Sequence, residues 1–382
     1  MPQLAKFATH HKNSFGRIHP EQGVPSDFEF ALDRERIVHS TAFRRLEYKT
    51  QVFVNHVGDH YRTRLTHSLE VSQIARSIAR ALKVNEDLAE IIALCHDIGH
   101  PPFGHAGEYG LQEAASEFGG FDHNAHALKI VTEIEQGHIG FNGLNLTLNT
   151  LDGLAKHNGP VPKNSVHVYT ITKSLGINPN THSSIEAQIA ALSDDIAYIN
   201  HDIDDGIRAD MFDIEEICQI DLVNSIFRKL SKKYHNQPVR KIINEMIREL
   251  VEFMKADLVA QTRIMIKNYG VETLEDAMNC GVDIVSSSEG VEKMKLQLKA
   301  FLMEKVYRNY KVNRMMMKSK TMIQDMYSYF TSHPECLPTN WYKKMDIANK
   351  KDISTTVIDY IAGMTDRFAI DEHKKIFDQT YF

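Results

Sequence analysis

The residues best suited to chemistry lie in one short run, ALCHDIGHPPFGHAGE, at positions 93–108. It places an imidazole beside a carboxylate, His96 and Asp97, at the end of an apolar segment, and then breaks at a glycine and two prolines. Three proton-transfer candidates follow in the same run: His100, His105 and Glu108. A borderline-soft ligand beside a hard one, with acids and bases nearby, suits a divalent metal and hydrolytic chemistry. A histidine–aspartate pair alone would equally suit a capped helix end with a neutral histidine, so the elements around it must decide.

Two predicted helices bring candidate ligands toward each other. Between residues 65 and 83, apolar side chains recur every three or four residues on one stripe, and His67 falls on that stripe. A single histidine on such a face is more often a satisfied core residue than a ligand. Asn85 can cap the next helix, which is apolar around most of its girth and is expected to be deeply buried. The end of that helix carries the histidine–aspartate pair.

A third predicted helix begins at Ser183 and has an aliphatic stripe and an acidic one. Asp194, Tyr198 and Asp202 stand four residues apart, so they span about 80° of the helix circumference. Acidic stripes are usually solvated faces, yet these groups also suit one metal ligand and two side chains that line a cleft. An aspartate of this helix would complete a set of two histidines and two carboxylates. That mixed set suits Mn²⁺, Fe²⁺, Ni²⁺ or Zn²⁺, and Mg²⁺ less well.

The bulk composition is that of an ordinary globular chain of 382 residues, 42% hydrophobic and 25% charged. Its net charge of −6 has no basic excess, so nucleic-acid binding is not indicated. The four cysteines show no CxxC spacing and are interpreted as reduced thiols. With no leader and no apolar stretch of about 18 residues, we expect a cytoplasmic protein without a membrane segment. The 20 histidines favour a metal site.

The pattern predicts a single all-α domain over residues 1–382. Residues 119–180 are rich in glycine, asparagine and proline and predict short helices and loops, with one helix near 122–135 and room for one small β-hairpin. Beyond residue 213 come amphipathic helices, such as 237–257 and 289–310.

The order H…HD…D and the sequence around these residues resemble those of the HD-domain superfamily of metal-dependent phosphohydrolases. Within it, the chain is similar to the bacterial deoxyguanosine triphosphate triphosphohydrolase-like proteins. The similar motifs are SFGR at 14–17, HSTAFRRLEYKTQVF at 39–53, TRLTHSLEV at 63–71, HDIGHPPFGHAGE at 96–108, FDHNAH at 121–126, LAKHNGP at 154–160, SDDIAYINHDIDDG at 193–206 and DYIAGMTDRFA at 359–369. Two mild departures are SFGR, where relatives often have SRGR, and FDHNAH, where FEHNAQ is common.

The resemblance implies hydrolysis of a dNTP (dGTP or a broader set) to deoxynucleoside and triphosphate, and thereby control of deoxynucleotide pools. It implies an HD core at about 35–225 and a helical C-terminal extension at about 226–382. It further implies one divalent metal (Mn, Fe, Ni or Zn), with Mg or Mn supporting activity. The metal ligands carried over are His67, His96, Asp97 and Asp194.

By the same resemblance His105 is the general acid, Glu108 orients it, and His123 is a second candidate acid or phosphate contact. The substrate-binding residues carried over are Gln51, Val52, Arg64, His100, Tyr198 and Asp202. Without the family, Arg64 and Gln51 would be interpreted as surface residues and Tyr198 as core. Five further residues lie in the motifs without an assignable role: Arg44, Arg45, Lys156, His157 and Arg367.

Two other functions stay open: an HD phosphomonoesterase or phosphodiesterase acting on nucleotides, and a non-catalytic binder of nucleotides or single-stranded nucleic acid. The family implies a homo-oligomer, a tetramer or hexamer, and leaves open an allosteric nucleotide. Base preference, the need for an activator, the native metal and the oligomeric state do not follow from the sequence.

Overall fold

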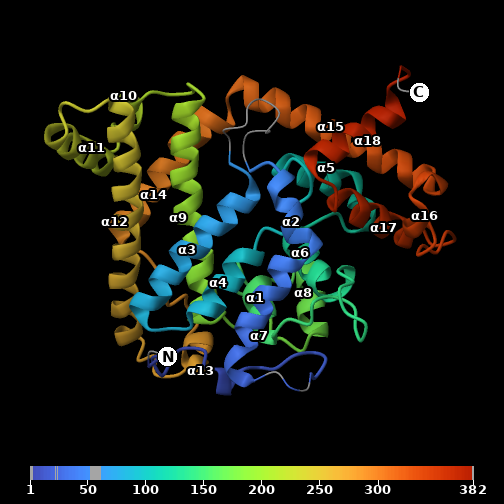
Figure 1. The fold of residues 1–382 in the computed structure, drawn as a ribbon, viewed down its shortest axis with the longest axis horizontal. Helices are drawn as coiled ribbons and strands as arrows, with labels where there is room; N and C mark the ends of the chain where they lie inside the picture. The colour runs from blue at the N-terminus through green and yellow to red at the C-terminus, as the bar shows by residue number, and fades with distance from the viewer. Residues whose placement is uncertain (1–2, 22, 24, 52–61, 381–382) are drawn as a thin grey trace.

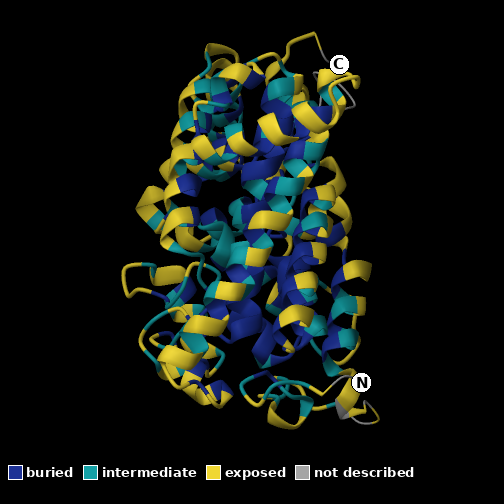
Figure 2. Cartoon of the chain, turned by 90° about the vertical axis from the view of Figure 1, so that its left-hand side faces the viewer, coloured by how far each residue is buried: buried dark blue, intermediate teal, exposed yellow. Residues whose placement is uncertain are grey.

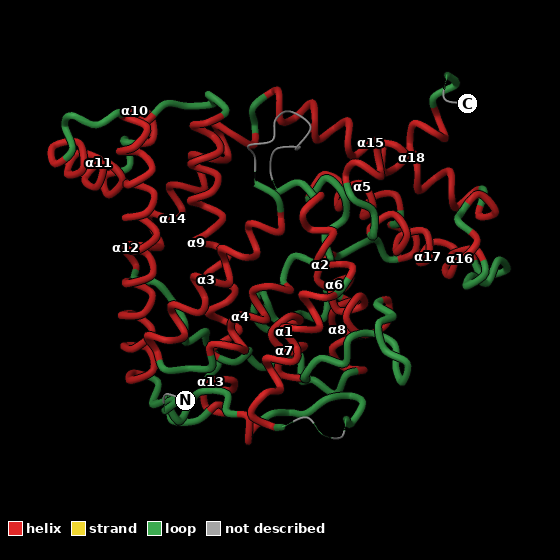
Figure 3. The backbone as a smooth tube through the Cα atoms, viewed as in Figure 1, coloured by secondary structure: helices red, strands yellow, loops and turns green. Residues whose placement is uncertain are grey.

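The computed structural model describes residues 3–21, 23, 25–51 and 62–380, so Val52 lies outside the described residues. The described chain consists of helices joined by loops and turns (Figure 3), which confirms the all-α prediction. The α-helices are α1 (Glu29–His39), α2 (Thr41–Arg45), α3 (Arg64–Leu82), α4 (Glu86–Cys95), α5 (His105–Ala114), α6 (His123–Lys129), α7 (Leu148–Ala155), α8 (Val166–Ser174), α9 (Ile185–Arg208), α10 (Ile214–Ile217), α11 (Asp221–Lys233), α12 (Val239–Asn268), α13 (Leu274–Asn279), α14 (Glu289–Leu302), α15 (Tyr310–Ser332), α16 (Thr339–Tyr342), α17 (Lys350–Ala362) and α18 (Asp366–Phe377). Short 3₁₀ or π turns are η1 (His11–Asn13), η2 (Ser26–Phe28), η3 (Leu46–Tyr48), η5 (Ser116–Phe118), η6 (Ile130–Ile134), η7 (Met303–Tyr307) and η8 (Pro334–Cys336).

The β-hairpin expected in residues 119–180 is wrong: this fully described segment contains helices and loops, with no strand. Its most extended stretch runs up to Thr147 and makes only an isolated bridge to Arg17. Side chains take the place of a partner strand there. Asp33 accepts the backbone N–H of Thr147 at 2.9 Å, and Arg36 donates to two carbonyl oxygens of the same stretch. The backbone groups are thereby satisfied without a second strand.

Three helices form the centre of the fold: α3, α4 and α9 pack on one another, and α1 covers α4. Each begins at a side-chain cap that the sequence supplies, Thr63 for α3, Asn85 for α4 and Ser184 for α9. The three helices match the predicted ones. The second ends at Cys95, so the histidine–aspartate pair follows the helix directly rather than lying within it.

Two hydrophobic cores run through the molecule. The larger one joins α1, α3, α4, α7 and α9 with α11, α12 and α14, and α12 stands beside α9 in Figure 1. The smaller one joins α5 with α15, α17 and α18 at the other end of the molecule. Figure 2 shows the buried residues gathered inside a shell of exposed helix faces. The C-terminal helices therefore contribute to both cores.

No helix among the described residues combines the length and the apolar character that crossing a bilayer requires.

Candidate functional site

Four side chains from three elements meet where α4 ends. His67 comes from α3, Asp194 from α9, and His96 and Asp97 from the turn after α4. The Nε2 of His67 lies 2.9 Å from the Oδ1 of Asp194 and 4.0 Å from the Oδ2 of Asp97. The Nε2 of His96 lies 3.6 Å from an oxygen of each aspartate. The structure therefore brings together all four residues that the sequence named as ligands.

Two of the potential metal-binding atoms in this cluster are left unpaired. The Nδ1 of His96 lies 2.7 Å from the carbonyl oxygen of Ala93, so Nδ1 carries a proton and Nε2 is the nitrogen that faces the other ligands. That Nε2 and the Oδ2 of Asp97 are buried, and no described residue forms a hydrogen bond with either atom. Ligands bonded to one ion at ~2.1 Å stand ~3–4 Å apart, which is the spacing found here. The residues fit a divalent metal.

The charges of the cluster stabilise one another. Burial lowers the pKa of His96, but the neighbouring Asp97 and Asp194 outweigh it and raise that pKa to about 9. Burial raises the pKa of Asp97, but Arg64 and His96 outweigh it and hold that pKa well below its usual range. Arg64 is buried, with its Nη1 2.9 Å from the Oδ1 of Asp97, so it is not a surface residue. Its Nε is buried and has no hydrogen-bond partner within the described part of the chain.

A second cluster of proton carriers surrounds Glu108 on α5. One carboxylate oxygen lies 3.2 Å from the Nδ1 of His105, and the other lies 2.6 Å from the Nδ1 of His123. Burial raises the pKa of Glu108, but hydrogen bonds from both histidines outweigh it and hold that pKa below its usual range. His105 is half exposed, with 53% of its side chain accessible, and His123 is less so at 21%. Glu108 thus orients two candidate acids at once.

His100 connects the two clusters. Its Nδ1 lies 3.1 Å from the Oδ1 of Asp97, and its ring centroid lies 4.0 Å from that of His123. Burial, followed by the charge of Arg64, holds the pKa of His100 well below its usual range, so the ring is neutral.

The loop between α4 and α5 has no room for a side chain at two of its positions, Gly99 and Gly104. A Cβ on Gly99 would lie 2.0 Å from the carbonyl oxygen of His123 and 2.5 Å from the backbone nitrogen of Ala127, because α6 rests directly on this loop. Gly104 has a φ of +56° and would place a Cβ 2.7 Å from the Nη2 of Arg64. The two glycines therefore let α6 and Arg64 approach the site closely.

On α9, Tyr198 and Asp202 meet a residue that the sequence analysis missed, Tyr307 of η7. The Tyr307 hydroxyl donates to Asp202 and shares a hydrogen bond with the Tyr198 hydroxyl, and the two rings stack at 6.3 Å. Asp202 is buried, and burial, with a further contribution from Asp205, raises its pKa to about 8. The stripe on this part of α9 is therefore not a solvated face.

Of the two residues expected near the sugar, Gln51 is described and Val52 is not. The Oε1 of Gln51 is buried and has no hydrogen-bond partner among the residues that the structure describes. The residues just before it are tied to the C-terminal helices. Lys49 donates to the carbonyl oxygens of His100 and Ala362, and Asp366 accepts the backbone N–H groups of Thr50 and Phe103.

The structure gives places to the residues that sequence left unassigned. Lys156 is buried against Asp152 at 2.5 Å, which marks it as a structural ion pair. The Nε2 of His157 lies 3.5 Å from the Oδ2 of Asp194, and its ring stacks on His96. Arg367 lines a separate cavity between α15 and α18.

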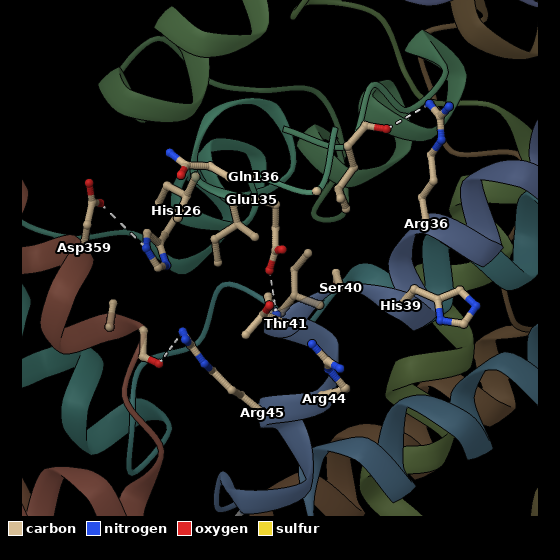
Figure 4. A pocket seen from close by; sticks show the side chains of 18 of the residues that line it. Arg36, His39, Ser40, Thr41, Arg44, Arg45, His126, Glu135, Gln136 and Asp359 are labelled. Carbon is tan, nitrogen blue, oxygen red and sulfur yellow. Dashed lines mark hydrogen bonds and ion pairs between the residues drawn. The ribbon is translucent and has the colours of Figure 1, made fainter. Parts of the chain in front are cut away.

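Arg44 and Arg45 line a cavity of about 730 Å³ behind the site (Figure 4). Arg45 donates to the carbonyl oxygen of Gly363 at 2.8 Å, while Arg44 makes no ion pair within the described part of the chain. Lys49 and His126 line the same cavity and also bond the carbonyl oxygens of His100 and Gly99, so the cavity adjoins the loop that follows α4.

Sequence reasoning also missed two residues behind His67. The Nδ1 of His67 lies 3.1 Å from the Nδ1 of His201, whose Nε2 contacts Glu70. Burial lowers the pKa of His201 to about 4. Burial raises the pKa of Glu70, but hydrogen bonds from His201 and the charge of Arg62 outweigh it and lower that pKa to about 2. His201 and Glu70 stand within the named motifs, but only their contacts single them out.

Comparison with known families agrees with this geometry. The HD domain matches residues 64–199, and the phosphohydrolase-associated domain matches residues 285–375. The fold and the His/Asp cluster thus define an HD-domain hydrolase, a metal-dependent class.

Proteins named deoxyguanosinetriphosphate triphosphohydrolase-like protein match nearly the full length. The one from Parvibaculum lavamentivorans is 45% identical over 98% of this chain and 96% of its own. The protein from Caulobacter sp. (strain K31) is 44% identical over 98% of this chain and 96% of its own. The protein from Rickettsia conorii is 41% identical over 99% of both chains. The chain belongs to the deoxyguanosinetriphosphate triphosphohydrolase-like family, as the sequence resemblance predicted.

Proposed function

We propose that this protein hydrolyses a deoxynucleoside triphosphate to the deoxynucleoside and intact triphosphate, and so limits deoxynucleotide pools. Water attacks the α-phosphorus, and the 5′ oxygen of the sugar leaves. One observation carries the proposal. The ring of His100 lies between the unpartnered ligand atoms of His96 and Asp97 and the candidate acids that Glu108 holds. A phosphate between the two clusters would meet a cation on one side and a proton donor on the other.

The proposed metal ligands are His67, His96, Asp97 and Asp194, which suit Mn²⁺, Fe²⁺, Ni²⁺ or Zn²⁺, with Mg²⁺ or Mn²⁺ supporting activity in solution. The ion would polarise a phosphate oxygen and lower the pKa of the attacking water. Arg64 holds Asp97 in place through its Nη1, and its unpartnered Nε leaves a donor for substrate phosphate.

The poor leaving group needs a proton, and His105 is the proposed source. Its ring is accessible, and Glu108 accepts from its Nδ1, so its Nε2 is the atom available to the substrate. His123, held by the same carboxylate, is the second candidate and lies beside His100, which is placed to contact phosphate.

The sugar is proposed to bind between Gln51 and Tyr198, with Val52 and Asp202 extending the pocket. The unpartnered Oε1 of Gln51 is an acceptor for a 3′-hydroxyl. Tyr198, held by Tyr307, presents a ring where a ribose 2′-hydroxyl would clash.

The cavity in Figure 4 is the proposed place for a regulatory nucleotide. Arg36, Arg44 and Arg45 supply positive charge on one side, and their cavity reaches the loop that carries His100 through Lys49. We also propose that the protein forms a homo-oligomer, a tetramer or hexamer, and that it acts in the cytoplasm.

The test is incubation with each dNTP in Mn²⁺ or Mg²⁺, with tripolyphosphate resolved from pyrophosphate and phosphate. Equal amounts of deoxynucleoside and tripolyphosphate are expected. Asp97→Ala is the matched control and should lose both metal, measured by mass spectrometry, and turnover, because the remaining ligands are under-coordinated. Phosphate released from monophosphates or cyclic nucleotides would point to a phosphomonoesterase or phosphodiesterase instead. Nucleotide or single-strand binding without turnover would point to a non-catalytic binder.

A further inference from the structure

A chain of polar contacts runs outward from the proposed metal ligand His67 on the side away from the other ligands. The Nδ1 of His67 meets the Nδ1 of His201 at 3.1 Å, and the Nε2 of His201 meets the carboxylate of Glu70. Arg62 closes the chain by donating to both oxygens of Glu70, at 3.2 and 3.3 Å. His67 and His201 are both buried, while Glu70 reaches solvent.

The direction of each hydrogen bond in this chain of contacts follows from Glu70, the carboxylate nearest the solvent. The Glu70 carboxylate faces two donors of Arg62 and can only accept, so the Nε2 of His201 must carry a proton. The two Nδ1 atoms lie 3.1 Å apart, so one donates and the other accepts; a His201 ring whose single proton is on Nε2 accepts from the Nδ1 of His67. The Nε2 of His67 then carries no proton, and its lone pair is free to bind a metal. That atom lies 2.9 Å from Asp194, inside the ligand cluster.

We propose that His201 is a positioning residue, which with Glu70 and Arg62 holds His67 in the one tautomer and ring orientation that can bind a metal. The inference rests on the proposed metal site but not on the substrate or the reaction. Histidine ligands commonly donate their second nitrogen to an acceptor, and loss of such a partner typically weakens metal binding 10–100-fold. The acceptor here is a second histidine, whose own tautomer is fixed from the surface.

The closing experiment measures Mn²⁺ affinity by chelator competition in the full-length protein. His201→Ala removes the acceptor and should weaken binding by about 10–100-fold. His201→Asn keeps an oxygen at the position of Nδ1 and should recover most of the affinity. Glu70→Ala should have a smaller effect than His201→Ala, because water can replace an exposed carboxylate. His182→Ala is the matched control: it breaks a histidine–carboxylate pair with Asp283, 2.7 Å long and outside the site, and should bind Mn²⁺ like the wild type.

A second readout reports the tautomer itself. In the Zn²⁺-loaded protein with ¹⁵N-labelled histidine, the Nδ1 of His67 should carry a proton in the wild type. An unprotonated Nδ1, or wild-type Mn²⁺ affinity in a folded His201→Ala, would overturn the inference while leaving the proposed function standing. If His201→Ala does not fold, the His201→Asn variant decides the matter. Wild-type Mn²⁺ affinity of that variant, together with an unprotonated Nδ1 of His67, would equally overturn the inference. A wild-type protein that binds no divalent metal would refute the proposed function, and the inference with it.

Discussion

At the scale of single residues, one carboxylate serves two histidines. Glu108 holds His105 at the accessible side of the site and His123 deeper, beside His100. A proton donor to the leaving 5′ oxygen has to be reachable by the substrate, and His105 is the more exposed of the two rings. This favours His105 as the acid and His123 as a phosphate contact.

His105→Ala should therefore keep the metal and lose about 10²–10⁴-fold in kcat, the usual contribution of general acid catalysis. Metal content and single-turnover rates measure the two effects separately. His333→Ala removes an exposed histidine beside Glu335 and should leave both quantities unchanged. A His105→Ala variant with a near wild-type rate would move the role of acid to His123.

Tyr198 is the residue we propose to discriminate between sugars, and Tyr307 holds it by stacking and by a shared hydrogen bond. A ribose 2′-hydroxyl forced against the ring would be buried without a partner, at a cost of roughly 1–3 kcal/mol, so at least about tenfold preference for dGTP over GTP is expected. The ratio of kcat/KM for the two nucleotides should collapse in Tyr198→Ala. In Tyr269→Ala, which changes an exposed tyrosine at the end of α12, the ratio should persist. Equal hydrolysis of both nucleotides by the wild type would contradict the pocket.

Single residues also show where sequence reasoning ended. The resemblance to the family was enough to name the proposed ligands, because each stands in one of its motifs. Tyr307 could not be found in this way. It lies 109 residues from Tyr198 in sequence, and nothing local distinguishes it from other tyrosines. Contacts between distant helices depend on packing, which periodicity does not encode.

At the scale of elements, the site depends on how closely α6 rests on the loop after α4. The predicted beginnings of α3, α4 and α9 lie within two residues of the observed ones, and Asn85 caps α4 as predicted. In the segment 119–180 the helix predicted near 122–135 is present as α6 and η6, but the β-hairpin is not, because the stretch before Thr147 is bonded by Asp33 and Arg36 from far upstream rather than by a neighbouring strand.

Gly99→Ala tests the contact between α6 and this loop. The new methyl group would press on the backbone of α6 at His123 and Ala127. Overpacking of this kind costs about 1–3 kcal/mol of unfolding free energy. Because the displaced element carries His123, kcat should fall as well. Gly290→Ala in α14 meets no atom within 4 Å and should be neutral or slightly stabilising, with unchanged kcat. Equal stability and activity of Gly99→Ala and the wild type would contradict the packing.

At the scale of the whole molecule, the C-terminal helices are part of the site's support. The first residue of α18, Asp366, accepts backbone N–H groups from Thr50 and Phe103, which precede Gln51 and α5 respectively. The sequence predicted this region as amphipathic helices with one family motif, at 359–369, but without its contacts. Its contacts reach back more than 250 residues, as between Phe103 and Asp366 at a separation of 263, so no local pattern could reveal them.

Lys49 joins these parts and gives the fold a pH dependence. It is buried, and burial lowers the pKa of its ammonium group to about 7, against 10.5 for an ordinary lysine. Between about pH 7 and 10.5 the folded protein therefore binds fewer protons than the unfolded one, and the free energy of unfolding rises with pH in this window. Below pH 7 both states are charged, and the cost of burying the ammonium group is fully present. The neutral amine can still donate to His100 and Ala362.

Lys49→Met removes this titration. The free energy of unfolding of the wild type, relative to Lys49→Met, should rise by roughly 1–3 kcal/mol between pH 6.5 and 9. Denaturant titrations of both proteins at the two pH values measure the difference. Lys232→Met, at an exposed lysine of α11, should run parallel to the wild type. A difference that stays constant or falls with pH would mean that Lys49 keeps its charge in the folded protein, and that Asp366 and the two carbonyl oxygens compensate fully for its burial.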